Sequence, residues 1–367
     1  MLQFRVYQGR ERTGGGMAKT CLVTGGLGFI GQYVVQQLLA QGSQVRILDL
    51  AQPEQPLEGV DYIQGSITDP TLVDQAMADV QWVFHLAANA GLWSPRKQDF
   101  LTVNQTGTRT IMLAAQRAGV QRVVHTSTES ILKTDKGKGP AVIDESVKLT
   151  FDDMVGAYCQ GKFLAEQEAF AAADRGLPVV IVNPTIPIGP GDRRLTPPSR
   201  MVLGFLNGDY PAFLNSTLNV VDARDVATGH ILAAEKGRIG ERYLLGNTNL
   251  QLKELLQILT DLTGLPMPQR QVPYWLALTV SLVQELIADY VTHRPPTAPL
   301  TGVRLAGSPL CFSTQKAAQE LGFTGRPVQA SLLDAIHWYS QRGLLQRQPT
   351  HKNPSQNLSP KSPPAKN

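Results

Sequence analysis

A tyrosine and a lysine four residues apart, Tyr158 and Lys162, lie in the segment GAYCQGKFLAEQEAF, whose pattern predicts a helix. This spacing places both side chains on one face of the helix. A tyrosine hydroxyl has an unperturbed pKa of about 10, and it is a poor base at neutral pH unless a nearby cation stabilises the phenolate. Lys162 can supply that charge, so the pair predicts acid/base chemistry on an oxygen atom. A lone YxxxK pattern on a solvated helix is common, and the interpretation therefore depends on the rest of the chain.

Two hydroxyl residues, Ser127 and Thr128, close the predicted strand RVVHTS. Ligands of open α/β sheets bind at the carboxyl ends of the strands. A hydroxyl at this edge can hold a substrate oxygen beside Tyr158, which gives the tyrosine and lysine a partner.

A glycine-rich turn, TGGLGFIG, follows the predicted strand CLVT and opens a predicted helix. Gly25, Gly28 and Gly31 give a GxxGxxG spacing, and Gly26 allows a GxGxxG reading. Glycine permits a positive φ and close approach of a diphosphate to the amides at a helix start, where the helix dipole favours negative charge. Such a turn can also be purely structural, so the motif alone is a weak signal.

An aspartate, Asp49, ends the next predicted strand, QVRILD, at the position where a carboxylate accepts hydrogen bonds from an adenosine ribose. The same carboxylate would face the 2′-phosphate of NADP as a like charge. Leu50 and Ala51 follow it, Arg46 lies earlier within the strand, and no neighbouring residue in the sequence offers a replacement cation. We therefore expect NAD to be preferred over NADP.

The elements that must position these residues alternate in type along the chain. Short β-branched runs alternate with longer amphipathic stretches, which is typical of helices crossing between parallel strands. The predicted strands are CLVT, QVRIL, DYIQ, QWVFHLA, RVVHTS and PVVIVNP. The pattern predicts an α/β fold, a Rossmann-type doubly wound parallel sheet with a smaller C-terminal α/β substrate-binding domain.

The proline and glycine residues of NPTIPIGPGDRRLTPP mark the predicted domain boundary. We expect a disordered leader at 1–16, a NAD-binding domain at 17–190 to which later segments return, a mainly substrate-binding domain at 191–345 and a disordered tail at 346–367. Helices are expected from about 197 to 207, 251 to 262 and 328 to 343.

Taken together, these motifs resemble the extended short-chain dehydrogenase/reductases, the NAD-dependent epimerase/dehydratase family, over nearly all of residues 19–345. HLAA at 85–88, VNQTGT at 103–108 and NPTIPIGP agree with the same family. The amino-acid sequences of several segments most resemble those of hopanoid-associated sugar epimerases, which are themselves similar to dihydroflavonol reductases. The resemblance implies catalytic Thr128, Tyr158 and Lys162. It implies cofactor contacts from Gly25, Gly28, Phe29, Ile30, Gly31, Asp49, Ser66, Ile67, Ala87, Asn104, Tyr158, Lys162 and Pro184.

Three positions depart from the family pattern. Thr128 stands where family members often have Ser, and Ser127 is an alternative hydroxyl. Dehydratases follow this Thr with two acidic residues, whereas here only Glu129 is acidic and Ser130 follows, which disfavours dehydration. Ser66 stands where the family usually places an Asp against the adenine.

The composition favours a folded enzyme with a small-molecule substrate. The net charge is only +4 and the basic residues are scattered, which argues against nucleic acid as a partner. Three widely separated cysteines suggest neither a disulfide framework nor a zinc site and fit the cytoplasm. His85 and Cys159 are interpreted as structural. Arg193, Arg194 and Arg200 are either a clamp for a substrate diphosphate or merely solvated. The family resemblance implies a homodimer through paired helices.

The most apolar stretch, residues 274–291, is interrupted by Gln284, Glu285 and Asp289, so it does not make a membrane-spanning helix. A buried or lid helix is the leading interpretation. Peripheral contact of this stretch with a membrane surface, where a lipid-like substrate resides, is the alternative.

Three hypotheses for the function remain open. The first is a NAD-dependent epimerase or oxidoreductase of sugar-nucleotides or related hydroxylated substrates. The second is a ketone reductase or alcohol dehydrogenase of the dihydroflavonol or hydroxysteroid kind, with a hydrophobic substrate. The third, a dinucleotide sensor without turnover, is disfavoured because Tyr158 and Lys162 are both present.

Overall fold

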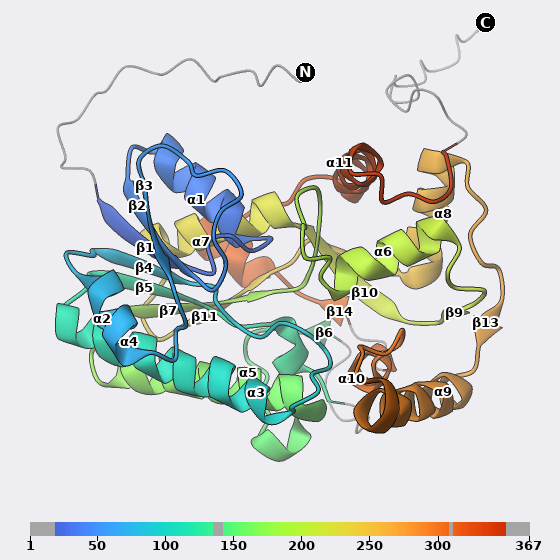
Figure 1. Cartoon of the computed structure of the whole chain (residues 1–367), viewed down its shortest axis with the longest axis horizontal. Coiled ribbons are helices and arrows are strands. Elements are labelled where there is room, and N and C mark those ends of the chain that lie inside the picture. Colours follow the sequence, from blue (N-terminus) through green and yellow to red (C-terminus); the bar gives the residue numbers. More distant parts are fainter. Residues whose placement is uncertain (1–18, 135–141, 308–310, 350–367) are drawn as a thin grey trace, which may run out of the picture.

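A computed structural model describes residues 19–134, 142–307 and 311–349 of the chain (Figure 1). The expected leader at 1–16 and residues 350–367 of the expected tail lie outside the described residues. All six strands expected from the sequence are present within one or two residues of their predicted bounds.

A seven-stranded sheet forms the centre of the molecule, with the order β11-β7-β5-β4-β1-β2-β3. Every neighbouring pair in it is parallel. The strand order reverses beside β1, which is the switch point where open α/β sheets bind ligands. The doubly wound Rossmann-type fold class is therefore confirmed. The strands are β1 (Thr20–Thr24), β2 (Gln44–Asp49), β3 (Val60–Gln64), β4 (Trp82–His85), β5 (Arg122–Thr126), β7 (Val179–Pro184) and β11 (Arg242–Leu245).

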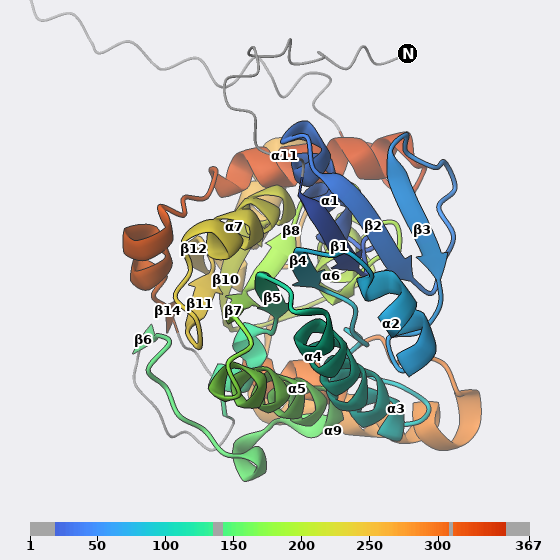
Figure 2. The same cartoon turned by 90° about the vertical axis from the view of Figure 1, so that its left-hand side faces the viewer.

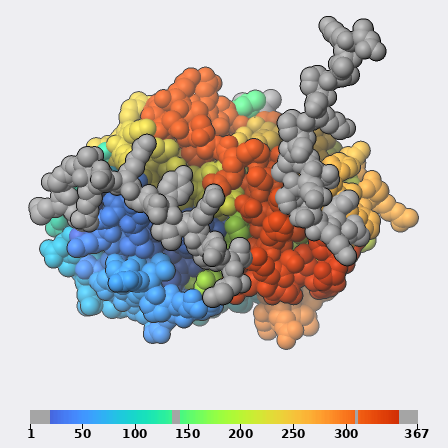
Figure 3. All heavy atoms as spheres, turned by 90° about the horizontal axis from the view of Figure 1, so that it is seen from above, coloured from blue at the N-terminus to red at the C-terminus, as the bar shows by residue number. Residues whose placement is uncertain are grey.

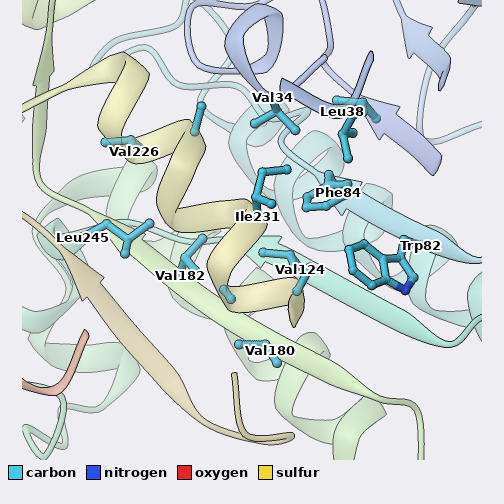
Figure 4. Close-up of a cluster of buried hydrophobic side chains, with 14 of the residues drawn as sticks. Val34, Leu38, Trp82, Phe84, Val124, Val180, Val182, Val226, Ile231 and Leu245 are labelled. Carbon is cyan, nitrogen blue, oxygen red and sulfur yellow. The ribbon is translucent and has the colours of Figure 1, made fainter. Parts of the chain in front are cut away.

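Helices cover both faces of this sheet (Figure 2). The apolar residues of α1 (Gly31–Ala40) and α7 (Ala223–Lys236) pack on one face, and Figure 4 shows how Val34, Ile231 and Phe84 meet there. The opposite face is covered by α2 (Pro70–Met77), α4 (Gly107–Ala118) and α5 (Gly156–Asp174). A strand with both faces buried must be apolar throughout, which explains the continuous β-branched runs in the sequence. Two short segments, α3 (Gln98–Phe100) and the π-helix η1 (Leu101–Thr106), lead into α4.

A smaller part of the chain has its own apolar core beside the large sheet. Its sheet has the order β12-β10-β8. Its helices α6, α8 and α11 match the three helices expected from the sequence. The elements are β8 (Ile186–Ile188), β10 (Thr217–Asp222), β12 (Thr248–Gln251), α6 (Pro197–Asn207), α8 (Leu252–Thr263) and α11 (Val328–Gln341). Seen from above, α11 in red lies beside the blue N-terminal elements (Figure 3).

The chain does not pass from the large sheet to the smaller part at a single boundary near residue 190, because later segments return to the large sheet. Both α7 and β11 come from the later part of the chain, yet they complete the large sheet and its cover. The remaining elements are short: β9 (Phe213–Leu214) pairs with β13 (Gln271–Val272), and β6 (Val142–Ile143) pairs with β14 (Cys311–Phe312). Further short elements are the 3-10 turns η2 (Glu129–Leu132) and η3 (Phe151–Asp153) and the π-helix η5 (Ala317–Leu321).

The apolar stretch 274–291 forms α9 (Tyr274–Ile287) and the π-helix η4 (Ala288–Thr292), followed by α10 (Leu300–Ala306). The sequence predicted a buried or a lid helix; burial is wrong, and the lid role stays a prediction. Within α9 only Ser281 is buried, whereas Trp275 is 66% exposed, and in η4 Tyr290 is 79% exposed. Among the helices of the described part, none is both long and apolar enough to cross a membrane.

Candidate active site

The glycine-rich turn is packed so tightly that side chains cannot replace its glycines. Gly25 has φ +70°, and a Cβ there would lie 2.8 Å from the backbone nitrogen of Ala87. A Cβ on Gly31 would collide with the carbonyl oxygen of Gly25. The turn therefore brings bare backbone to the start of α1, whose first amides have no partner within the helix and favour an anion. This cradle fits a dinucleotide diphosphate.

Asp49 lies at the carboxyl end of β2, beside this turn, and its side chain is 7% exposed. One carboxylate oxygen accepts a hydrogen bond from the Leu27 amide at 3.2 Å, and the other accepts from the Ala51 amide at 3.1 Å. A cavity of about 250 Å³ opens at this position, and Asp49, Pro53 and Gln64 are among the residues that line it. The carboxylate is thus held at the place expected for the adenosine ribose.

A cation that the sequence did not place here reaches Asp49 from the loop after β8. The Arg194 Nη2 atom lies 3.3 Å from the Asp49 Oδ1 atom, although 145 residues separate them. The loop that carries Arg194 is anchored on α1, because the Tyr33 hydroxyl donates to the Pro190 carbonyl at 2.7 Å. Arg193 pairs with Glu54 at 3.3 Å in the same region. The expectation that Asp49 has no neighbouring cation is therefore wrong.

The three residues predicted to be catalytic meet where β5 ends. Lys162 is 5% exposed, and its ammonium donates to the Thr126 carbonyl at 2.7 Å. One turn earlier on α5, the Tyr158 hydroxyl is hydrogen-bonded to the side chain of Thr128. The expectation that Tyr158 and Lys162 share the site-facing side of a helix is consistent with this geometry. Ser127, the alternative hydroxyl, is buried and has no hydrogen-bond partner at its Oγ atom.

Burial controls the protonation of this group. Desolvation lowers the pKa of Lys162 from 10.5 to about 8, and Glu166 partly opposes that change. Desolvation also raises the pKa of Tyr158, while the hydrogen bond from Thr128 lowers it. At neutral pH the tyrosine is therefore a proton donor and the lysine is still charged.

A buried carboxylate beside this group was not assigned a role from the sequence. The Glu129 Oε2 atom accepts the Thr128 hydroxyl at 3.1 Å and also accepts the Ser130 hydroxyl. The Lys133 ammonium lies 3.8 Å from the other oxygen, and both side chains are less than a tenth exposed. The charge of Glu129 contributes to the raised pKa of Tyr158. Glu129 was visible in the sequence as an acidic residue next to Thr128, but nothing local showed that the 3-10 turn η2 would bury it.

The helices α9 and α10 lie next to each other (Figure 1), and polar contacts join the α9 segment to the loop after β4. The Trp93 indole donates to Asp289 at 2.6 Å, and Lys97 pairs with both Glu285 and Asp289. On the other side, a Cβ on Gly156, two residues before Tyr158, would collide with Thr301 of α10. The exposed apolar segment is therefore fixed to the loop after β4, and the neighbouring α10 packs on the start of α5, the helix that carries Tyr158.

Comparison with known proteins agrees with this arrangement. A family model described as the NAD dependent epimerase/dehydratase family matches residues 21–246. The chain belongs to this family. Members of this family are NAD(P)-dependent epimerases, dehydratases and reductases, so the chain is an enzyme of that extended short-chain dehydrogenase/reductase type.

Three relatives cover nearly the whole folded chain. A dihydroflavonol 4-reductase-like protein of Synechocystis sp. is 40% identical over 340 residues, which cover 90% of this chain and 98% of that protein. Sterol demethylase protein B of Methylococcus capsulatus is 32% identical, with 89% and 100% covered. The structure of DesIV, a dTDP-glucose 4,6-dehydratase from Streptomyces venezuelae with NAD bound, is 25% identical, has a TM-score of 0.70 and covers 89% and 99%.

The other residues that the family resemblance predicted as cofactor contacts have different surroundings. Ala87 donates its amide to Thr24 and packs on Gly25, and Phe29 and Ile30 lie in the turn itself. Ser66 follows β3 and bonds with Thr68, Ile67 is buried against Gly107, and Pro184 ends β7. Asn104 is different, because its amide group bonds with the backbone of Asn89 at 2.7 and 3.2 Å. Its side chain therefore positions the loop after β4.

His85 and Cys159 have the structural surroundings expected of them. The two ring nitrogens of His85 bond with Thr24 and Thr108, and burial lowers the pKa of His85 to about 3. Cys159 is fully buried in an apolar cluster with Ile143 and Phe312, and burial raises the pKa of its thiol to about 12. A thiol in that state is not an effective nucleophile.

Proposed function

We propose that this enzyme is a NAD-dependent oxidoreductase that interconverts a ketone and a secondary alcohol on an apolar substrate. The observation that carries the proposal is the group formed by the half-buried Tyr158 and the buried Thr128 and Lys162, next to a dinucleotide cradle and an apolar helical segment. The cofactor contacts expected from the sequence, including Gly28, Gly31 and Asp49, are part of the same proposal.

Bound NAD(H) supplies or accepts the hydride in such a reaction. In the reductive direction Tyr158 donates its hydroxyl proton to the carbonyl oxygen, which Thr128 holds by a hydrogen bond. Lys162 stabilises the phenolate that this transfer leaves, because its ammonium is one helical turn away and poorly solvated. In the oxidative direction the same phenolate takes the proton back.

The nature of the substrate is argued from the surroundings of the site. Arg193 and Arg194, which the sequence offered as a clamp for a substrate diphosphate, pair instead with Glu54 and Asp49 on the ribose side. The segment on the substrate side, α9 with η4, presents apolar side chains. Two relatives carry names that refer to a flavonol and to a sterol, which are ring systems with little charge. Sugar-nucleotide epimerisation remains the second candidate, supported by the likeness to a dTDP-glucose dehydratase.

We extend the proposal to a preference for NAD over NADP. The nearly buried Asp49 carboxylate would repel a 2′-phosphate, and specificity of this kind usually needs a repulsive element. The positive charge of Arg194 opposes that repulsion. Because the Arg194 side chain is 61% exposed, solvent screens its charge and the repulsion by Asp49 remains. Dissociation constants for both dinucleotides, measured on the wild type and on an Asp49→Ala, Leu50→Arg double variant, test this. Equal affinity in the wild type, or no shift in the variant, would contradict it.

The reaction is tested by incubating the purified enzyme with apolar cyclic ketones and NADH and, separately, with UDP-sugars and NAD, because an epimerase first oxidises a sugar hydroxyl. We expect oxidation of NADH in step with ketone loss, and no conversion of the sugar nucleotides. An epimerase returns the hydride within one cycle, so conversion of a UDP-sugar without net NADH change would overturn the proposal.

The assembly and location belong to the proposal as well. A homodimer through paired helices is supported by α4 and α5 lying side by side with Leu113 exposed on α4. A cytoplasmic location is supported by Cys21, Cys159 and Cys311 all being free thiols. Sedimentation equilibrium of the purified enzyme tests the dimer.

A further inference from the structure

The helix α9 and the π-helix η4 have their polarity reversed relative to an ordinary surface helix. A surface helix normally turns its apolar stripe toward the core and its charged side toward water. Here large apolar side chains are exposed, and six of them define what we call the α9 face: Trp275, Leu282, Val283, Leu286, Ile287 and Tyr290.

The polar residues of the same segment point toward the protein. Glu285 pairs with Lys97 at 3.1 Å and accepts the Leu300 amide at 3.0 Å. Gln284 accepts the Ala298 amide at 3.1 Å, and Asp289 accepts the Trp93 indole at 2.6 Å. These residues hold α9 on the loop after β4 and on the segment before α10, so the outward direction of the apolar side chains is fixed by polar contacts.

The nearest charged residues on either side of the segment in the sequence are basic. Between residues 274 and 292 the only acidic side chains are Glu285 and Asp289, both pairing with Lys97. The exposed Arg270 precedes the segment and the exposed Arg294 follows it. Aromatic residues, Trp275 and Tyr290, stand near its two ends, as they do at the boundary between lipid and water.

We propose that the α9 face docks on the surface of an anionic lipid leaflet. The 14-residue helix is too short to span a bilayer, and a helix with one apolar side and basic flanks lies in the plane of the interface. Two adjacent stripes are apolar, one through Trp275, Leu282 and Leu286 and one through Val283 and Ile287. This face is wider than the narrow seam by which one helix packs on a single partner helix, so a planar surface covers it better than a second copy does.

This docking deepens the proposed function, because the leaflet would be the source of the apolar substrate. That part of the inference rests on the proposed function. Because α9 and η4 are fixed to Trp93 and Lys97 on one side of the catalytic group, a docked enzyme has its substrate side next to the leaflet. An apolar ketone dissolved in the lipid then reaches Tyr158 without crossing water.

The test is sedimentation of the full-length enzyme with vesicles, which does not depend on turnover. Vesicles are made of phosphatidylcholine alone or with one third phosphatidylglycerol. We compare the wild type with a Trp275→Ser, Leu286→Ser variant and with a control, Leu57→Ser, Ile239→Ser, which removes exposed apolar side chains elsewhere. We expect binding that is stronger with phosphatidylglycerol, a loss of at least about tenfold in the first variant and no loss in the control.

Tryptophan fluorescence gives an independent readout. Vesicles should shift the emission of the wild type to shorter wavelength, and a Trp275→Phe variant should bind but lose most of that shift. Failure of the wild type to bind either vesicle overturns the proposal, as does equal loss in the control. The proposal is also overturned if the wild type is a dimer that does not bind vesicles and the Trp275→Ser, Leu286→Ser variant is a monomer. That result would show that a second copy of the chain covers the α9 face. Failure in the ketone assay with intact vesicle binding would overturn only the proposed reaction.

Discussion

Replacing Lys162 by methionine should make the folded protein more stable at neutral pH while abolishing its activity. The lysine is buried with its ammonium charged, and burial lowers its pKa from 10.5 to about 8. That difference corresponds to a penalty of about 3 kcal/mol for keeping the charge in the folded state. Methionine has no charge to desolvate and has a similar length. The substitution removes the hydrogen bond from the Lys162 ammonium to the Thr126 carbonyl, which stabilises the fold by about 1 kcal/mol. We therefore expect a net gain of roughly 2 kcal/mol at pH 7.

The pH dependence of this gain has a definite sign. Above pH 10.5 lysine is neutral in both the folded and the unfolded chain, and the penalty is absent. As the pH falls toward 8 the unfolded chain binds the proton first, so the penalty grows, and below pH 8 it is fully present. The advantage of the Lys162→Met variant should thus be largest below pH 8 and shrink between pH 8 and 10.5.

The difference in the free energy of unfolding between the wild type and Lys162→Met is measured by urea unfolding without added cofactor. Linear extrapolation to zero urea is carried out at several pH values. Lys253→Met, at an exposed position on α8, is the matched control and should show no such trend. A Lys162→Met variant that is less stable than the wild type at pH 7, or a difference independent of pH, would refute the desolvation argument. Turnover and cofactor affinity should both fall, which fits a residue retained for function at a cost in stability.

Three further outcomes follow from the site. Tyr158→Phe should lower kcat by about 10² to 10⁴ while leaving the NAD dissociation constant nearly unchanged, and near-normal turnover would contradict its role. Glu129→Gln removes a negative charge that raises the pKa of Tyr158, so the pH profile of alcohol oxidation should move to lower pH, with Glu129→Asp restoring it; a fall in kcat with an unmoved profile would indicate a structural role only. Arg194→Ala should weaken NADP binding more than NAD binding, because it leaves Asp49 unopposed, and equal effects on the two dissociation constants would argue against the pair.

Much of the fold could be predicted because its signals are local. The β-branched runs of the central strands of the large sheet are buried on both faces, and their length and composition are enough to identify strands. Tyr158 and Lys162 are related by one helical turn, and Thr128 by its place at a strand end, so their meeting follows from parallel-sheet geometry. Asp49 was placed at the cradle by the same argument.

The contacts that escaped prediction join distant segments. Arg194 reaches Asp49 across 145 residues because the loop after β8 folds back over α1, and no local pattern encodes that path. Glu129 stands next to a predicted residue, yet its burial depends on Lys133 and on the turn η2. In both cases the residue type was visible and its partner was not.

The reversed helix shows a different limit, because hydrophobic periodicity fixes which side chains share a face but not which face meets the protein. In α9 the polar residues Gln284 and Glu285 were interpreted only as interruptions that exclude a membrane-spanning helix, whereas they also make the contacts that attach α9 to the protein. An inward acidic residue needs a partner, and Lys97 on the loop after β4 provides one. The apolar side chains then have no place except outside. A polar residue within an apolar stretch is therefore evidence of attachment when a complementary charge lies on a neighbouring loop, and the exposed side must be explained by what it contacts.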